Sequence, residues 1–273
     1  MVFRPLLTLL SSYVLYKAYK NTEDIQIKNI DLKPSASSQS TNKAKLTILH
    51  LSDLHLENIS ISPEQLAKKL TNQSIDMIAL TGDFLDRKRT IPKLIPYLKI
   101  LQNVKAPLGM YAVLGNHDYV LKGQNLQQLK ALLESFDCHV LQNEHRTVYF
   151  QNQKINIIGI DDYSTGRSDL QQAYQNISNG IHIVLTHDPN IVLEMEDYPF
   201  DYLMAGHFHG GQICYPKAYH LVKMGKLPRQ NIIKGLHFHQ EKPFYISEGL
   251  GQTGINIRIG SRPEITFHHM YIS

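Results

Sequence analysis

Short apolar runs recur along most of the chain, and each of them ends in polar residues. Their apolar positions follow one another instead of alternating with polar ones, which is the pattern of strands buried on both faces. We therefore expect strands within residues 45–55, 75–84, 109–118, 154–162, 181–189, 201–209 and 242–251, and a terminal strand within 263–272.

Segments with helical features lie between several of these runs. Residues 62–71 are expected to form a helix, because Ser62 is a favourable N-cap and Pro63 suits the first helical position. A second helix is expected over residues 125–135. Strands interspersed with helices predict an α/β domain whose sheet is covered by helices on its outer faces.

The chain divides into three parts by composition. Its 273 residues, 42% of them hydrophobic, are enough for one large domain, which we expect over residues 46–273. Residues 21–45 are expected to be a linker, since 34–45 are polar and rich in serine. Residues 1–20 form a separate N-terminal segment.

This N-terminal segment is predicted to be a helix that lies on a membrane surface. Its apolar run from Pro5 to Tyr16 is shorter than the ~20 residues that span a bilayer, and Arg4, Lys17 and Lys20 lie near its ends. A signal sequence, a short membrane span and a simple packing helix remain as alternatives, although no small-residue cleavage site follows the run cleanly.

Charge and cysteine content narrow the function classes. The net charge of +4 comes entirely from residues 1–45, so the main domain is neutral overall and nucleic acid is not the expected partner. Cys138 and Cys214 form no CxxC pair, which argues against a disulfide framework or a zinc finger. They fit a reducing compartment. The sequence indicates no oligomeric state.

Polar side chains capable of binding metal follow five of the predicted strands. Since ligands gather at the carboxyl ends of strands in open α/β sheets, we expect these side chains to form one site. A single-residue gap, as in 53–55 and 207–209, places both side chains on one side of an extended segment. The candidates are Asp53, His55, Asp83, Asn116, His117, His187, His207 and His209.

The chemistry of this set indicates a metal centre. Carboxylates and imidazoles without a thiolate suit Mn, Fe or Zn. The donors are too many for one ion that keeps an open coordination position, so two ions are expected. Two ions ~3.5–4 Å apart can clamp a phosphoryl group and activate water.

The motifs DLH, GDFLD, GNHD, THD and GHFH, in this order, resemble those of the calcineurin-like metallophosphoesterases over about residues 46–273. The resemblance implies a layered α/β fold in which mixed β sheets pack as a sandwich flanked by helices. It also implies two metal ions, with Mn as the preferred identity and Fe or Zn as alternatives. The first would be bound by Asp53, His55 and His209, the second by Asn116, His187 and His207, and both by Asp83.

The same resemblance implies the catalytic residues. His117 matches the family's catalytic histidine, and Asp86 matches the acid that orients it. Arg87 stands where some members bind phosphate, although residues 87–89 also fit a solvated basic turn. The implied reaction is in-line attack on phosphorus by a hydroxide that bridges the metals.

Two longer stretches, 98–119 and 247–265, resemble a bacterial membrane-associated subgroup, some members of which resemble UDP-2,3-diacylglucosamine pyrophosphatases of lipid A synthesis. Phe208 stands where that subgroup usually has Thr, and its side chain is expected to face away from the metals. The resemblance to this subgroup makes UDP-2,3-diacylglucosamine the preferred substrate and the cytoplasmic face of a bacterial inner membrane the expected location. Residues 214–239, which are basic and hold no acidic residue, could meet an anionic headgroup or be an ordinary loop.

Other functions remain open beside this one. A broad-specificity phosphodiesterase acting on nucleotides or cyclic nucleotides would use the same metals, as would a nuclease. A non-catalytic scaffold is disfavoured, because every ligand position of the family is filled and His117 is present.

Overall fold

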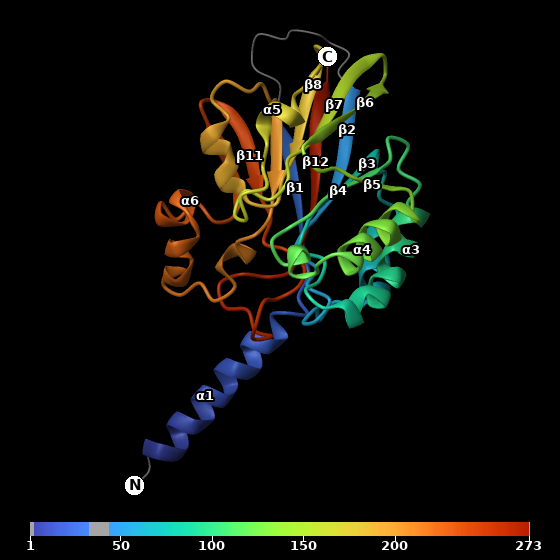
Figure 1. Cartoon of the computed structure of the whole chain (residues 1–273). Coiled ribbons are helices and arrows are strands. Elements are labelled where there is room, and N and C mark those ends of the chain that lie inside the picture. Colours follow the sequence, from blue (N-terminus) through green and yellow to red (C-terminus); the bar gives the residue numbers. More distant parts are fainter. Residues whose placement is uncertain (1–2, 33–43, 273) are drawn as a thin grey trace.

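The computed structural model describes residues 3–32 and 44–272, which form two six-stranded sheets packed face to face (Figure 1). In the first sheet, β1 and β12 are parallel, β12 and β2 are antiparallel, and β2 to β5 run parallel to one another. Its spatial order is β1 (Gln26–Leu32), β12 (Glu264–Ile272), β2 (Ala44–Leu51), β3 (Met77–Thr81), β4 (Met110–Val113) and β5 (Cys138–Val140).

The second sheet is also mixed. Its four central strands are parallel, and each edge strand is antiparallel to its neighbour. Its spatial order is β10 (Gly235–His239), β11 (Lys242–Ile246), β9 (Tyr202–Ala205), β8 (Ile181–Leu185), β7 (Gln153–Gly159) and β6 (Glu144–Phe150).

Side chains from the inner faces of both sheets form the central core. Ile48 and Val113 of the first sheet belong to one buried cluster with Ile157, Leu185 and Met204 of the second. Burial of one such side chain contributes about 1.5–3 kcal/mol. The continuous apolar runs of the sequence follow from this arrangement, because the other face of each sheet is covered as well.

Helices cover the outer face of each sheet, so the domain has four layers (Figure 1). The predicted layered α/β fold with mixed sheets is confirmed. The first sheet is covered by α2 (Pro63–Leu70), the 3-10 helix η1 (Lys88–Leu94), α3 (Ile95–Asn103) and α4 (Gln124–Glu134). The second is covered by α5 (Leu170–Ala173), η3 (Pro189–Glu194), η5 (Tyr219–Met224) and α6 (Lys226–Arg229). Two further short 3-10 helices are η2 (Asp118–Val120) and η4 (His209–Gly211).

Both predicted helices are present, and the hydrogen bonds at the start of α2 explain why the sequence predicted where this helix begins. The Ser62 hydroxyl accepts a hydrogen bond from the Gln65 amide at 3.2 Å, and the Gln65 side chain accepts one from the Ser62 amide at 2.7 Å. This reciprocal capping satisfies two amides that have no partner inside the helix. The other predicted helix corresponds to α4.

The N-terminal segment forms helix α1 (Phe3–Lys20), which projects from the domain (Figure 1). Among the described residues, no helix combines the length and apolarity that crossing a membrane requires. The range expected to be a linker contains strand β1, which pairs with β12 along its full length. Residues 33–43, which hold most of the serine-rich stretch, lie outside the described residues.

Candidate metal centre

The polar residues that follow five strands meet at one end of the two sheets. Strands β2, β3 and β4 are parallel neighbours in the first sheet, and β8 and β9 are parallel neighbours in the second. Parallel neighbours end at the same edge, so the loops behind them converge. The first residue of β2 pairs with Ile272 near the C-terminus, and the site therefore lies at the opposite end of the domain.

Several of these residues have left-handed backbone conformations. The φ angle is 51° at Asp53, 40° at His55, 54° at Asp83, 77° at His207 and 51° at His209. Such conformations cost on the order of 1 kcal/mol or more for residues with a side chain and cluster at functional sites. Their concentration here shows that the loops turn sharply in order to direct these side chains inward.

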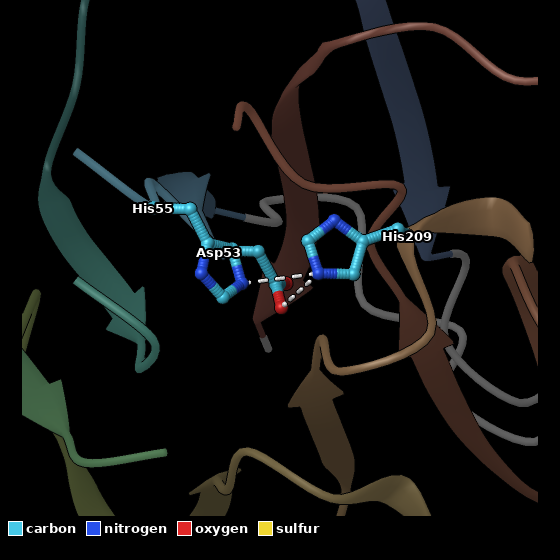
Figure 2. A group of neighbouring side chains, drawn as sticks. All are labelled: Asp53, His55 and His209. Atoms are coloured by element: carbon cyan, nitrogen blue, oxygen red, sulfur yellow. Dashed lines mark hydrogen bonds and ion pairs between the residues drawn. The ribbon is translucent and has the colours of Figure 1, made fainter. Parts of the chain in front are cut away.

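The first cluster consists of Asp53, His55 and His209, which point toward one another from two loops (Figure 2). His209 Nε2 lies 3.3 Å from Asp53 Oδ1 and 3.1 Å from His55 Nε2. The other ring nitrogen of His209, Nδ1, lies 3.2 Å from the Gly251 carbonyl, which can only accept. Nδ1 therefore carries the proton, and the lone pair of Nε2 faces Asp53 and His55.

The second cluster consists of Asp83, His187 and His207. His187 Nε2 lies 3.0 Å from Asp83 Oδ2 and 3.1 Å from His207 Nδ1. His187 Nδ1 donates to the Thr81 carbonyl at 2.7 Å, so Nε2 is the ring nitrogen that faces Asp83 and His207. The buried Asn116 Oδ1 has no hydrogen-bond partner among the described residues, which leaves another acceptor open here.

Asp83 connects the two clusters. The same oxygen, Oδ2, that lies 3.0 Å from His187 Nε2 lies 3.4 Å from His55 Nε2 of the first cluster. Nitrogen and oxygen ligands about 2.0–2.1 Å from a metal stand about 3.0–3.4 Å from each other in its coordination shell. The observed separations have this spacing, and carbonyls fix Nδ1 of His187 and of His209, so that Nε2 of each ring faces its cluster. The donor set thus fits two divalent cations.

Burial sets the charge states of these groups. Burial lowers the pKa of His207 to about 3 and that of His209 well below its usual value, so both imidazoles are neutral near pH 7. Burial would raise the pKa of Asp83, but His187 and His55 hold that pKa well below its usual range. Burial would lower the pKa of His187 and of His55, but the Asp83 carboxylate raises both, that of His187 well above its usual value. A bound cation would displace these protons, because neutral imidazoles and ionised carboxylates are the forms that bind metal ions.

Two glycines let the site loops approach each other. A Cβ atom on Gly206 would lie 1.9 Å from the Ser52 hydroxyl oxygen and 2.3 Å from Asp53 Oδ2. A Cβ atom on Gly115 would lie 2.2 Å from Asp83 Oδ1. Both distances are far below contact separation, so each position needs a residue without a side chain.

His117 borders the site and faces Asp86. Its ring packs edge-on against His55 at 4.7 Å between centroids, and its Nδ1 lies 3.7 Å from Asp86 Oδ2. The geometry also allows it to share a cation with His55 and Asp83. Glu57, which the sequence analysis did not identify, fixes this region by accepting hydrogen bonds from the amides of Asp86 and Arg87 at 3.2 and 3.1 Å.

Arg87 lies apart from the clusters. Its side chain is 58% exposed, and its Nε lies 3.5 Å from Asp86 Oδ1. It lines a surface hollow of charged side chains together with Glu57, Arg89 and Lys93. The hollow borders the Asp86 side of the site, so Arg87 faces solvent next to the centre and not its interior.

Asp118 was not identified from the sequence, although it belongs to the motif GNHD. Its carboxylate is buried and accepts four backbone hydrogen bonds, from Asp83 (2.8 Å), Phe84 (2.8 Å), Leu85 (3.2 Å) and Gly115 (2.9 Å). Burial and the neighbouring Asp83 raise its pKa to about 7. Asp118 thus connects the loops after β3 and β4 and fixes the backbone of Asp83.

A third residue that the sequence did not reveal is Arg258, which is fully buried. Its guanidinium donates to the carbonyls of Glu248, Gly249 and Gly251 at 2.8, 3.0 and 2.7 Å. Gly251 is the residue that accepts from His209, so Arg258 shapes the loop that orients this imidazole. Nothing in the sequence distinguishes Arg258 from an exposed arginine.

An apolar cavity of about 400 Å³ opens onto the clusters. Its polar side includes Asp83, Asn116, His117, His207 and His209. The remainder of its wall consists mainly of Phe208, Ile213, Leu221, Met224 and Ile255. Phe208 is buried in the apolar cluster outside the second sheet and forms part of this wall. A hydrophobic group can therefore approach the site from this direction.

A polar hollow of about 710 Å³ lies on the other side of His207. His207 and Met224 line both this hollow and the apolar cavity. The polar hollow also includes Tyr163, Asp188 and Lys223. The site thus has an apolar and a polar approach that meet at His207.

The other histidines singled out by their spacing lie away from the clusters. His50 of β2 and His268 of β12 are buried on neighbouring strands, and His50 Nδ1 lies 3.2 Å from His268 Nε2. His237 and His239 lie on edge strand β10, although no apolar run precedes them. The basic stretch 214–239 contains η5, α6 and β10 and is therefore largely ordered.

The model of the family described as calcineurin-like phosphoesterase matches residues 46–211. The metallophosphoesterase YkoQ of Bacillus subtilis is 61% identical over 256 residues, 94% of each chain. YkuE of the same organism, also named a metallophosphoesterase, is 30% identical and covers 80% of this chain and 77% of its own. The UDP-2,3-diacylglucosamine pyrophosphatase LpxG of Chlamydia muridarum is 29% identical, with coverage of 81% and 82%.

Proposed function

The chain belongs to the calcineurin-like phosphoesterase family and is a metal-dependent phosphohydrolase, and we propose that it cleaves a lipid-linked diphosphate or phosphodiester. The observation that carries the reaction class is the convergence of imidazole and carboxylate donors from five strand ends around Asp83. The observation that carries the substrate class is the apolar cavity that opens onto the same donors.

We propose that Asp53, His55 and His209 hold one ion, that Asn116, His187 and His207 hold another, and that Asp83 contacts both. The separations of 3.0–3.4 Å between donor atoms support this division. Two divalent ions would polarise a phosphoryl oxygen and activate water near neutral pH. Mn is the preferred identity, with Fe or Zn as alternatives, because the donors are imidazoles and oxygens without a thiolate.

His117 is the proposed general acid. Its ring is about one-quarter exposed and lines the apolar cavity beside Asp83 and Asn116, within reach of a leaving-group oxygen. Asp86 would hold Nδ1 of this ring and leave Nε2 to deliver the proton. Arg87 would bind a phosphate oxygen from the solvent side, after leaving its contact with Asp86.

UDP-2,3-diacylglucosamine is the proposed substrate, with UMP and an acylated sugar phosphate as products. Its acyl chains suit the apolar cavity, and the uridine nucleotide suits the polar hollow beyond His207. The similarity to LpxG supports the same substrate. We further propose that residues 1–20 bind the membrane surface in which such a substrate resides.

A broad-specificity phosphodiesterase is the second candidate. The polar hollow, at about 710 Å³, has room for a nucleotide without any lipid. Its Lys223 and Lys226 would attract a phosphate. A nucleotide diester would then be cleaved at the same centre, with the apolar cavity unused.

The test is a hydrolysis assay with Mn-loaded protein on UDP-2,3-diacylglucosamine, bis-p-nitrophenyl phosphate and a cyclic nucleotide. We expect release of UMP from the lipid substrate with a kcat/KM at least about tenfold above that for either soluble compound. Cleavage of the generic diester without release of UMP would refute the lipid assignment. Preferred cleavage of the cyclic nucleotide would establish the second candidate instead.

A further inference from the structure

Residues 213–231, which make up most of the segment between η4 and β10, form a cap beside the metal centre, and we call them the cap segment. Asn190 fastens it, because its side chain donates to the Met224 carbonyl at 2.9 Å and accepts from the Leu227 amide at 3.2 Å. Asn190 is itself held by Asp188 at 2.7 Å. Since Asp188 directly follows His187, the cap segment is tied to the loop that carries a proposed metal ligand.

The cap segment exposes large apolar side chains to solvent. Leu221 and Met224 face the apolar cavity, whereas other apolar side chains of the segment point outward. Ile213 of the cap and Ile255 of a neighbouring loop line the cavity and are also exposed, so they mark its mouth. We name this set the apolar rim: Ile213 (37% exposed), Tyr215 (82%), Tyr219 (65%), Val222 (41%) and Ile255 (66%).

Positive charge accompanies the apolar rim. Lys217, Lys223, Lys226 and Arg229 are exposed on the cap segment, and no acidic residue occurs from Cys214 to His239. A lysine or arginine near an anionic bilayer contributes about 1 kcal/mol to binding. Aromatic residues suit the level of the lipid headgroups, where their rings are half apolar and half hydrated.

The C-terminal end of helix α1 lies close to the loop that carries Ile255 of the apolar rim. The Arg258 amide donates to the Ala18 carbonyl, and the Asn21 side chain donates to the Arg258 carbonyl, both at 2.8 Å. Arg258 lies three residues after Ile255 of the apolar rim. Helix α1 projects from the end of the domain opposite to the C-terminus, which is the end that holds the metal centre (Figure 1).

We propose that the apolar rim and the cations of the cap segment together form a docking surface for an anionic phospholipid membrane. Docking places the mouth of the apolar cavity against the bilayer, so that an acyl chain reaches the centre without crossing water. This inference rests on the lipid-linked substrate proposed above, but it assigns membrane binding to the cap segment in addition to residues 1–20. The combination of exposed apolar and basic side chains is typical of interfacial binding.

The test is co-sedimentation of the full chain with vesicles of phosphatidylcholine and phosphatidylglycerol, and with vesicles of phosphatidylcholine alone. A rim variant carries Tyr215→Ser, Tyr219→Ser and Val222→Ser, and a cation variant carries Lys217→Gln and Arg229→Gln. We expect each to lower the partition onto anionic vesicles about tenfold. Wild-type protein should bind the neutral vesicles more weakly than the anionic ones.

Matched controls separate docking from folding and from the substrate. Tyr149→Ser, at an exposed tyrosine of β6, and Lys99→Gln, on α3, should bind vesicles as wild type does. All variants should hydrolyse bis-p-nitrophenyl phosphate normally. Unchanged partition of the rim and cation variants would overturn the proposal, since α1 alone would then bind the membrane. If UDP-diacylglucosamine is not cleaved while both variants lose vesicle binding, the substrate proposal fails and the docking surface stands.

Discussion

The carboxylate of Asp118 accepts a hydrogen bond from the backbone amide of Asp83 at 2.8 Å, and this contact sets the position of the side chain that joins the two donor clusters. Asp118 has backbone amides as its partners on both oxygens. An amide NH₂ in place of one oxygen would face N–H donors and leave them without an acceptor.

Asp118→Asn should therefore lower the free energy of unfolding by about 2–4 kcal/mol and weaken metal binding. Urea denaturation and a Mn titration measure the two effects. Asp197→Asn, at an exposed position, serves as the matched control and should change neither quantity by more than about 0.5 kcal/mol. A variant at Asp118 with normal stability and metal affinity would show that its hydrogen bonds do not hold Asp83 in place.

The proposed role of His117 predicts a loss of rate without a loss of metal. His117→Ala should lower kcat by about 10²–10⁴ and retain the wild-type metal content, because the ring would act on the leaving group and not as a ligand. Elemental analysis beside steady-state kinetics distinguishes the roles. His139→Ala, at an exposed histidine of β5, is the control. Depletion of metal in the His117 variant would make it a ligand with His55 and Asp83, which the geometry also permits.

Phe208 should affect lipid substrates more than soluble ones. Phe208→Thr removes apolar wall from the cavity and should lower the free energy of unfolding by about 2–4 kcal/mol. The KM for UDP-diacylglucosamine should rise about tenfold, while the KM for bis-p-nitrophenyl phosphate changes little. Phe238→Thr, at a side chain that is 66% exposed, is the control. Equal changes in KM for both substrates would argue against contact between Phe208 and an acyl chain.

The buried His50 predicts a loss of stability in acid. Burial lowers its pKa to about 3, from about 6.5 in the unfolded chain. Below pH 6.5 the unfolded state binds a proton at this histidine and the folded state does not. The free energy of unfolding therefore decreases as the pH is lowered from about 6.5 to about 3. From pH 8 to pH 5 the loss from this residue is about 2 kcal/mol. Urea denaturation at both pH values should show a correspondingly smaller loss for His50→Gln, whereas His139→Gln should behave as wild type. The same pH dependence in the His50 variant would refute this assignment.

The sequence was most informative where one local signal decides the structure. Continuous apolar runs predicted the buried strands, and Ser62 with Pro63 predicted the start of α2. The proximity of the site residues followed from their places after parallel strands. These features depend on short stretches of chain and on the general geometry of sheets.

The remaining features depend on contacts between distant segments. Strand β1 was not foreseen, because most of its side chains are solvated and its stability comes from pairing with β12. The role of Arg258 depends on the carbonyls of a loop that only the folded chain brings around it. Glu57 likewise acts on the Asp86 and Arg87 amides, about 30 residues further along the chain.

The central claim is that seven side chains hold two metal ions, and that one of the seven, Asp83, contacts both. Non-denaturing mass spectrometry of the Mn-loaded full chain counts these ions directly. We predict two Mn ions per wild-type chain and a loss of at least one in Asp83→Asn, because that residue would contact both. A single ion in the wild-type protein, or two retained ions in the variant, would contradict the account.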